Sequence, residues 1–166
     1  MAASVGERKM DISKLLIDLQ RMPGSDDLVM HPVKFTQSLI HLEGRVSVSG
    51  AQIPQDYHRF LRVTNGATVY GNTLYGAKAV FMKYKKYSPS VIPSSDVKNY
   101  SGIWWIGEDP NGNDLLLAFT RKDLEAKLVV NPVLKDNAEG IEVVSSGFTE
   151  FLYSLLPDHK ITKSRR

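Results

Sequence analysis

The chain has 166 residues, of which 42% are hydrophobic and 23% are charged, a balance typical of one folded globular domain. It contains no cysteine, which excludes disulfide bonds, thiolate catalysis and cysteine-ligated zinc. The formal net charge of +3 comes from the end of the chain, where four basic residues lie within the last seven. Removing these four from the 21 basic residues leaves 17 against 18 acidic ones, so the body of the chain is close to neutral. Such a tail is typical of a solvated end rather than of a nucleic-acid footprint.

Residues 1–10 are small or charged, which predicts a flexible N-terminus, and they lack the apolar stretch of a secretory signal. No apolar run approaches the roughly 20 residues that a membrane-spanning helix needs. We therefore expect a cytoplasmic protein with one folded domain over residues 11–158 and a basic tail over residues 159–166.

Apolar residues follow a helical spacing in the first part of this domain. Over residues 11–22 they occur at i, i+3, i+4 and i+7, which predicts an amphipathic helix. These residues are Ile12, Leu15, Leu16 and Leu19. A second helix is expected over residues 33–43, ending at Gly44, with an apolar side formed by Phe35, Leu39 and Leu42. After it, Val46 and Val48 alternate with polar residues and indicate a short strand.

A third helix is expected to begin at Pro54, because proline suits the first helical position, where its missing N–H is no loss. The residues Asn65 and Gly66 predict a left-handed cap at its end. Its buried side is expected to contain Tyr57, Phe60 and Leu61.

From residue 68 to residue 119 the composition becomes strand-like, with short β-branched, aromatic or aliphatic runs separated by glycines. We expect strands at residues 68–70, 73–75, 79–82, 103–106 and 115–119. Residues 88–99 contain two prolines and predict a loop or a short helix.

Two further strands are expected at residues 127–133 and 141–144, joined by the polar residues 135–140. The chain then returns to a helical pattern, for which Ser146 is the expected N-cap. The apolar side of this helix contains Phe148, Phe151, Leu152 and Leu155. Helices at both ends of a meandering, mainly antiparallel sheet define the expected fold as a single α+β domain.

The sharpest local signal is a β-hairpin over residues 103–119. Asp109, Pro110, Asn111 and Gly112 fit a type I turn, with Asp first, Pro presetting φ and Gly last. Glu108, Asp109 and Asp114 form an acidic loop beside Trp104 and Trp105. Because neighbouring strand residues face opposite sides of a sheet, one tryptophan is expected in the core. The loop has two interpretations: a recognition surface for a basic partner, or a solvated turn beside core aromatics.

Other kinds of site have less support. The spacing of Asp109, Asn111 and Asn113 is reminiscent of calcium ligands, but Asp114 stands where the loop needs glycine and Thr120 where it needs glutamate. Residues 83–87, with Lys78 before them, interleave lysine and tyrosine, which is compatible with a nucleic acid and also with a protected sheet edge. The four histidines lack a metal-binding spacing, and no catalytic motif occurs. We expect no enzymatic activity, no metal and no cofactor.

Three segments, taken in order, resemble the SUKH superfamily of Smi/Knr-like domains. The first runs from Ile53 and Pro54 through Tyr57, Phe60 and Leu61 to Asn65 and Gly66, and Tyr75 with Gly76 is similar to the aromatic–glycine step that follows it. The second runs from Ile106 and Gly107 to Gly112, Asn113 and Asp114, with Asp114 at the position of the family's usual acidic residue. The third is Phe148, Thr149, Glu150, Phe151 and Leu152.

The resemblance implies a non-catalytic protein-binding domain without a cofactor. Many bacterial members are immunity proteins that neutralise a cognate toxin, often a nuclease, by binding it. The alternatives are a regulatory or scaffold module without a toxin partner, as in eukaryotic relatives, and a nucleic-acid-binding protein. The hypothesis places the partner-binding site at Trp104, Trp105, Glu108, Asp109 and Asp114, supported by Tyr70 and Tyr75.

Overall fold

The structure is a computed structural model in which the order of the strands follows the chain with little crossing over. It describes residues 12, 14, 15, 18, 28–33, 36–83, 86–88, 92, 95–124 and 130–156. Within these residues eight strands form one antiparallel sheet in the order β1-β2-β3-β5-β6-β7-β8, and β4 pairs with β5 beside that path. The strands are β1 Leu28–Met30, β2 Gly66–Val69, β3 Asn72–Tyr75, β4 Lys86–Tyr87, β5 Tyr100–Glu108, β6 Asp114–Thr120, β7 Val133–Asn137 and β8 Gly140–Ser145.

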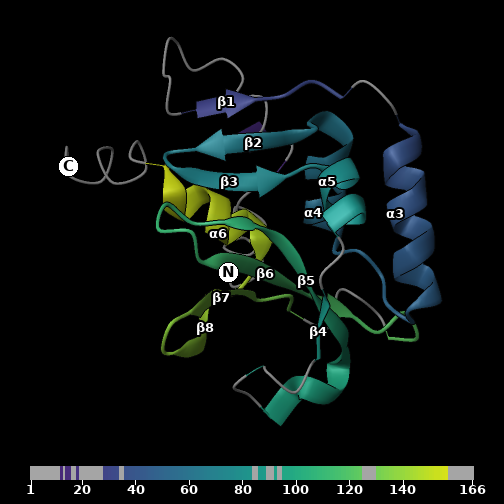
Figure 1. Cartoon of the computed structure of the whole chain (residues 1–166). Coiled ribbons are helices and arrows are strands. Elements are labelled where there is room, and N and C mark those ends of the chain that lie inside the picture. The colour runs from purple at the N-terminus through teal and green to yellow at the C-terminus, as the bar shows by residue number, and fades with distance from the viewer. Residues whose placement is uncertain are drawn as a thin grey trace, which may run out of the picture.

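The helices lie beside this sheet, which confirms the predicted single α+β domain. They are α3 Gln37–Val48, α4 Gln55–Val63, α5 Ala77–Lys83 and α6 Phe148–Leu155, with a short 3-10 helix η2 Ser95–Asn99 before β5. Figure 1 shows α3, α4 and α5 grouped at one end of β2 and β3, with α3 on the outside of the group. Residues 12, 14, 15 and 18 are helical, and Ile12 and Leu15 are buried, as expected for the first helix; Leu16, Leu19 and Phe35 lie outside the described residues.

The main core lies between the sheet and the helices and is rich in aromatic rings. Tyr57 and Phe60 of α4 contact Phe148 of α6, with ring centroids 4.9 and 5.1 Å apart. Trp104 of β5 stacks on Phe119 of β6 at 5.4 Å. Edge-to-face and offset ring pairs of this kind stabilise a core beyond the area that they bury. The buried helical stripe that the sequence predicts for α4 is therefore the surface on which α6 packs.

A second, smaller core lies on the other face of the sheet. It contains Ile92, Tyr100, Ile103, Leu116, Ala118 and Leu134. Along β6, Leu115, Leu117 and Phe119 belong to the main core and the residues between them to the second one. Burial of both faces explains why residues 115–119 form a continuous apolar run rather than an alternating one.

Helix α3 corrects two predictions. It does not end at Gly44 but continues to Val48, so Val46 and Val48 are helical and form no strand. Val46 is buried four residues after Leu42 on the same side of the helix, whereas Val48 is 90% exposed. The alternation of the two valines with polar residues fitted a strand, but helical burial of Leu42 and Val46 determines the structure.

Two other strand predictions are wrong, one in type and one in position. Residues 79–82 belong to helix α5, because burial of Ala77 and Val80, three residues apart, places one helical side on the core. The strand expected at residues 127–133 is β7, which begins only at Val133. Residues 135–137, expected in a polar connection, pair with β8 instead. Residues 127–129 lie outside the described part of the chain.

The ends of α4 differ slightly from the prediction. Pro54 is the N-cap rather than the first helical residue. The helix ends at Val63, and its C-cap Thr64 is extended rather than left-handed. Gly66 does have a positive φ of +107°, but it begins strand β2. Thr64 is fully buried, and its hydroxyl lies within hydrogen-bond distance of two carbonyl oxygens, 2.8 Å from that of His31 and 2.6 Å from that of Gly66. The buried Thr64 therefore turns the chain directly from helix to strand.

Helix α6 is capped by a residue from another helix. Its N-cap is Gly147, not the expected Ser146, and Gly147 has no side chain to cap the helix. The Asp56 carboxylate of α4 accepts hydrogen bonds from the Thr149 backbone N–H at 2.9 Å and from the Thr149 hydroxyl at 2.8 Å. A carboxylate at a helix N-terminus also interacts favourably with the helix dipole. Asp56 thus joins the first and the last of the three segments that resemble the SUKH pattern.

We expect Asp56→Ala to lower the free energy of unfolding by about 2 kcal/mol, because it leaves the first turn of α6 without its acceptor. Urea unfolding followed by tryptophan fluorescence measures this change. Gln55→Ala, at an exposed neighbouring position of the same helix, is the matched control and should change stability little. Equal stabilities of the two variants would contradict the capping role of Asp56.

Candidate partner-binding site

The β5–β6 hairpin has the predicted turn at its tip. The Gly112 backbone N–H donates to the Asp109 carbonyl oxygen at 3.0 Å, and the Asp109 N–H donates to the Asn113 carbonyl oxygen at 2.9 Å. Gly112 has φ +83°, a left-handed conformation that glycine adopts without a steric cost. A type I turn followed by a left-handed glycine is a common way to close a three-residue hairpin loop.

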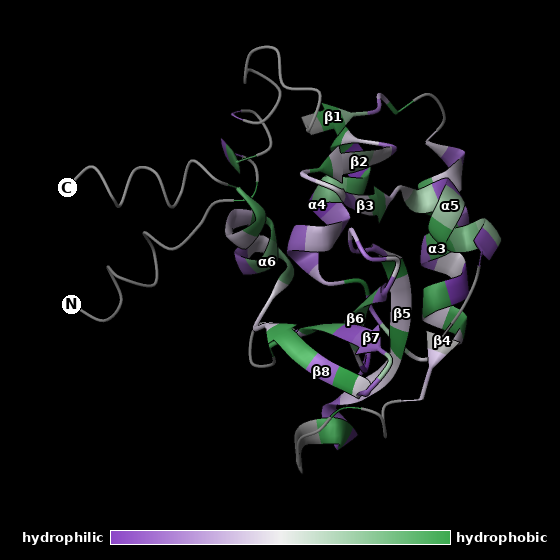
Figure 2. Cartoon of the chain, turned by 60° about the vertical axis from the view of Figure 1, so that its left-hand side comes forward, coloured by the Kyte–Doolittle hydropathy of each residue, from purple (hydrophilic) through white to green (hydrophobic). Residues whose placement is uncertain are grey.

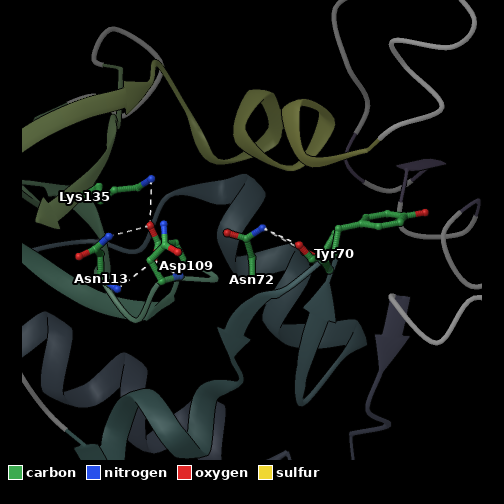
Figure 3. Close-up of polar contacts among 7 residues, drawn as sticks. Tyr70, Asn72, Asp109, Asn113 and Lys135 are labelled. Carbon is green, nitrogen blue, oxygen red and sulfur yellow. Dashed lines mark hydrogen bonds and ion pairs between the residues drawn. The ribbon is translucent and has the colours of Figure 1, made fainter.

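The Asp109 carboxylate lies inside this turn. It accepts hydrogen bonds from the backbone N–H groups of Asn111 and Asn113 at 2.9 and 2.8 Å and from the Asn113 side chain at 3.0 Å. The Lys135 ammonium of β7 lies 3.0 Å from it (Figure 3). Burial opposes ionisation of Asp109, but the hydrogen bonds from Asn113, Lys135 and Asn111 outweigh it and lower its pKa to about 2. Asp109 is only 6% exposed, so its carboxylate stabilises the hairpin tip from within.

The two tryptophans lie on opposite faces of β5, as the sequence predicts. Trp104 is fully buried in the main core. Trp105 is half-buried on the other face, where its ring meets the edge of Tyr75 with centroids 5.3 Å apart. Its Nε1 donates to the Gly107 carbonyl oxygen at 2.8 Å. Of the two rings, Trp105 is therefore the one that a partner can reach.

A cation and a carboxylate surround the Tyr75–Trp105 pair. The Tyr75 hydroxyl donates to Glu108 at 3.1 Å. The Lys83 ammonium lies 5.4 Å from the centre of the Tyr75 ring and 5.8 Å from that of Trp105, within the range of cation–π attraction. Burial, followed by the hydrogen bond and the charge of Glu108, raises the pKa of Tyr75 to about 12. The Tyr75 hydroxyl therefore stays protonated and acts as a donor at neutral pH.

Three carboxylates lie in register across neighbouring strands. Glu108 of β5 pairs with Asp114 of β6, which pairs with Asp136 of β7. The Tyr87 hydroxyl of β4 lies 3.0 Å from Asp114 and 2.9 Å from Asp136, so both carboxylates lie on the same face as Tyr87. Like charges directly opposite one another repel in a sheet, and the Tyr87 hydroxyl between Asp114 and Asp136 offsets part of this repulsion. We call the side of the sheet that carries Tyr75, Trp105, Glu108, Asp114 and Asp136 the hairpin face.

The sequence does not predict that Asp136 and Tyr87 belong with these residues. Asp136 is expected in a polar connection, and only the register of β6 with β7 brings it opposite Asp114. Tyr87 lies in the lysine–tyrosine segment, whose pattern indicates a nucleic-acid contact or a protected sheet edge, whereas its hydroxyl lies within hydrogen-bond distance of Asp114 and Asp136. Within that segment Lys83 lies on helix α5 rather than on an edge strand. Residues 84 and 85 lie outside the described residues.

Tyr70 occupies a different place from Tyr75. It lies in the two-residue turn between β2 and β3 with φ +48°, and Gly71 follows with φ +88°. These angles define a type I′ turn, which a tyrosine rarely occupies. The Asn72 side chain donates to the carbonyl oxygens of Val69 and Tyr70 at 3.1 and 3.4 Å and fixes the turn (Figure 3). Tyr70 packs against the main core, and no contact described for it joins it to Trp105 or Glu108.

The described residues contain no group of three histidine, cysteine, aspartate or glutamate side chains placed to hold a metal ion. Among the helices that the structure describes, none is long and apolar enough to cross a membrane.

Comparison with models of known protein families identifies the family of this chain. The family model described as SMI1 / KNR4 family (SUKH-1) matches residues 41–154. This match covers more than half of the chain and includes all three motif segments, so the chain belongs to the SMI1 / KNR4 family (SUKH-1). No curated protein and no solved structure gives a significant match.

Proposed function

We propose that this chain is an immunity protein of the SUKH type, which neutralises a cognate protein toxin in the cytoplasm by binding it through the hairpin face. The observation that carries the proposal is the combination, on one face of β5 and its neighbours, of a half-buried tryptophan with three carboxylates in register. Membership of a family of protein-binding domains supports it. The proposal includes no catalytic step.

The chemistry of this face favours a basic partner surface. Tryptophan and tyrosine provide large, rigid contact areas, and residues of this kind dominate the energetics of protein interfaces. Glu108 and Asp114 are partly exposed beside them, so an arginine or lysine of the partner can be attracted to the row of carboxylates. A basic surface is typical of enzymes that act on nucleic acids, which fits a nuclease toxin.

The first experiment identifies the partner. The chain is used as bait in its native lysate after nuclease treatment, at about 0.15 M salt, where exposed long-range charge effects are screened. Recovery of one stoichiometric partner with a toxin domain supports the proposed binding. Inhibition of that purified toxin by the purified chain then supports the proposed neutralisation. A set of signalling proteins would favour the regulatory alternative. Material that is recovered only from a parallel lysate without nuclease treatment would favour the nucleic-acid-binding alternative.

The second experiment tests the face with the purified pair. We expect Glu108→Lys combined with Asp114→Lys to weaken toxin binding by about 100-fold or more. The two new lysines make the former row of carboxylates positive, and it then repels a basic surface. Calorimetric titration measures the affinity, and thermal unfolding checks that the variant is folded. Asp109 is left unchanged because its carboxylate holds the turn.

The matched control is Asp123→Lys. It makes one acidic-to-lysine change, half of the charge change of the double variant, at an exposed position outside the hairpin face. It should bind the toxin like the wild type. Full affinity of the Glu108 and Asp114 double variant would remove the hairpin face from the interface.

A further inference from the structure

The rings of Tyr75 and Trp105 form a corner on the hairpin face. Their planes are 83° apart and their centroids are 5.3 Å apart. Both side chains are half-buried, so part of each remains open to solvent. Aromatic rings that face one point from different sides bind a cation together, and protein sites for ammonium groups use this arrangement. We call this pair of rings the aromatic corner.

The polar atoms of both rings are already engaged. The Tyr75 hydroxyl donates to Oε2 of Glu108 at 3.1 Å, and Nε1 of Trp105 donates to the Gly107 carbonyl oxygen at 2.8 Å. The rings are therefore oriented before a ligand arrives, which lowers the entropic cost of binding. Among the described residues, none gives a hydrogen bond to the other oxygen of Glu108, Oε1. A carboxylate oxygen thus remains available beside the rings.

A lysine of the chain itself occupies the aromatic corner. Lys83, the last residue of α5, places its ammonium 5.4 Å from the centre of the Tyr75 ring and 5.8 Å from that of Trp105. Helix α5 contacts both β3 and β5, and Figure 2 shows it on the far side of β5 from α6. Within the described part of the chain, this ammonium has no hydrogen-bond or ion-pair partner, and Glu108 lies beyond ion-pair distance. The corner therefore accepts a cation, but the resident one leaves the carboxylate unused.

We propose that the aromatic corner receives one arginine side chain of the bound protein, and that Lys83 holds the corner in the free chain until this arginine displaces it. This role rests on the proposed function, since the arginine belongs to the protein that the hairpin face binds. A guanidinium is planar, so it stacks on an aromatic ring and still donates hydrogen bonds to a carboxylate. The arginine thus contacts both the rings and Glu108, whereas Lys83 contacts the rings alone.

The resident lysine also makes the corner selective. A contact between an exposed cation and a ring is weak, so Lys83 leaves readily when a better ligand arrives. A protein surface without an arginine has to leave the lysine in place or expel it without compensation. Specificity arises in this way when the wrong partner meets a cost that the right one avoids. We therefore expect Lys83 to weaken all binding to the corner, and to weaken it least for arginine.

A small probe tests the corner without any toxin. It is a tripeptide with blocked ends and arginine between two glycines, titrated into the full chain at constant ionic strength. The chain has two tryptophans, so its ¹H–¹⁵N NMR spectrum has two indole signals, and Trp105→Phe assigns one of them to Trp105. We expect this signal to shift with a dissociation constant on the order of 1–10 mM, as for one side chain. The same tripeptide with citrulline, which has the shape of arginine without its charge, should not shift it.

Two matched variants test the displacement. Lys83→Met should tighten binding of the arginine tripeptide by about 3- to 5-fold, because the competing cation is gone. Lys78→Met makes the same change at another exposed position of α5 and should bind the tripeptide like the wild type. In the wild type, the Hε protons of Lys83 should resonate upfield of those of other lysines, because they lie near two rings. Saturation with the tripeptide should return them to the ordinary position, which a purely structural role of Lys83 does not predict.

Glu108→Gln tests the second contact of the arginine. The amide oxygen still accepts the hydrogen bond from Tyr75, so the ring keeps its orientation while the charge is removed. We expect binding of the arginine tripeptide to weaken by about 5-fold, because a hydrogen bond to a charged acceptor is the stronger kind. Unchanged affinity would show that the ligand does not contact the carboxylate and would overturn the proposed preference for arginine.

Three results would overturn the proposal in its other parts. They are a Trp105 signal that does not move up to about 50 mM tripeptide, well above the expected dissociation constant, an equal shift with citrulline, and equal affinities of the Lys83→Met and Lys78→Met variants. The titrations contain no toxin, so such a failure leaves the proposed function standing. Failure to recover a toxin from the lysate would overturn the proposed function instead, and the titrations would still decide whether the corner binds arginine.

Discussion

Gly107→Ala is expected to lower the free energy of unfolding by at least about 3 kcal/mol, because strands β3 and β5 cannot stay paired around the added methyl group. A Cβ atom on Gly107 would lie 2.1 Å from the Thr73 carbonyl oxygen and 3.2 Å from the Leu74 Cα. Both are backbone atoms of β3, so no side-chain rotation relieves the overlap. Gly107 also pairs with Leu74 in the sheet, so the strand would have to move away.

Urea unfolding compares this variant with Gly44→Ala, which is the matched control at a glycine with open space. Gly44→Ala should leave stability unchanged or raise it by up to about 1 kcal/mol, as expected for a helix interior. A Gly107→Ala variant as stable as the wild type would show that β3 and β5 separate without cost. It would then leave the glycine of this family motif unexplained.

Asp109→Ala is expected to cost about 3 kcal/mol at neutral pH, because it removes the acceptor of three hydrogen bonds and the partner of Lys135 from a buried site. The four groups that Asp109 gathers come from the turn and from β7, so the loss should loosen the hairpin tip as well as the pairing of β6 with β7. Asp123→Ala is the control. Its carboxylate is 61% exposed and pairs with Arg121, so no measurable change is expected.

The lowered pKa of Asp109 predicts that the free energy of unfolding depends on pH. The pKa of Asp109 is about 2 in the folded protein and 3.8 in its ordinary environment, so between these values the unfolded chain binds more protons. The stabilisation by ionised Asp109 is therefore complete above about pH 5 and is lost as the pH falls toward 2, a loss of about 2 kcal/mol. Asp109→Asn should lose correspondingly less stability than the wild type over this interval. Parallel curves for the two proteins would show that Asp109 is not the titrating group.

The elements that the sequence predicts well are those in which one local rule decides the structure. Helix α4 has a helical repeat of Tyr57, Phe60 and Leu61 after a proline, and the core buries these residues. The hairpin of β5 and β6 has a turn whose residues fit one turn type. Helix α6 follows the same pattern as α4, although its cap could not be found locally, because Asp56 lies 93 residues from Thr149.

The errors occur where a short segment satisfies two patterns. Residues 79–82 are all apolar and include the β-branched Val80 and the aromatic Phe81, yet they are helical because Ala77 and Val80 pack on the core. At the site, the turn and the two faces of Trp104 and Trp105 were predictable from strand geometry. The row of carboxylates was not, since Asp136 joins it only through the register of β7, which depends on pairing across the whole sheet.

The bond between Asp56 and Thr149 has a consequence for synthesis of the chain. The strands are added to the sheet almost in the order in which they leave the ribosome, because sequential neighbours pair along most of it. Phe119 contacts Tyr57 of α4, but Phe148, which contacts both Tyr57 and Phe60, is made only after all eight strands. Until then a nascent chain carries a partly exposed aromatic helix side beside a growing sheet, a combination that favours aggregation. Helix α6 closes this core, so synthesis that stops before Phe148 releases a chain whose core is open on that side.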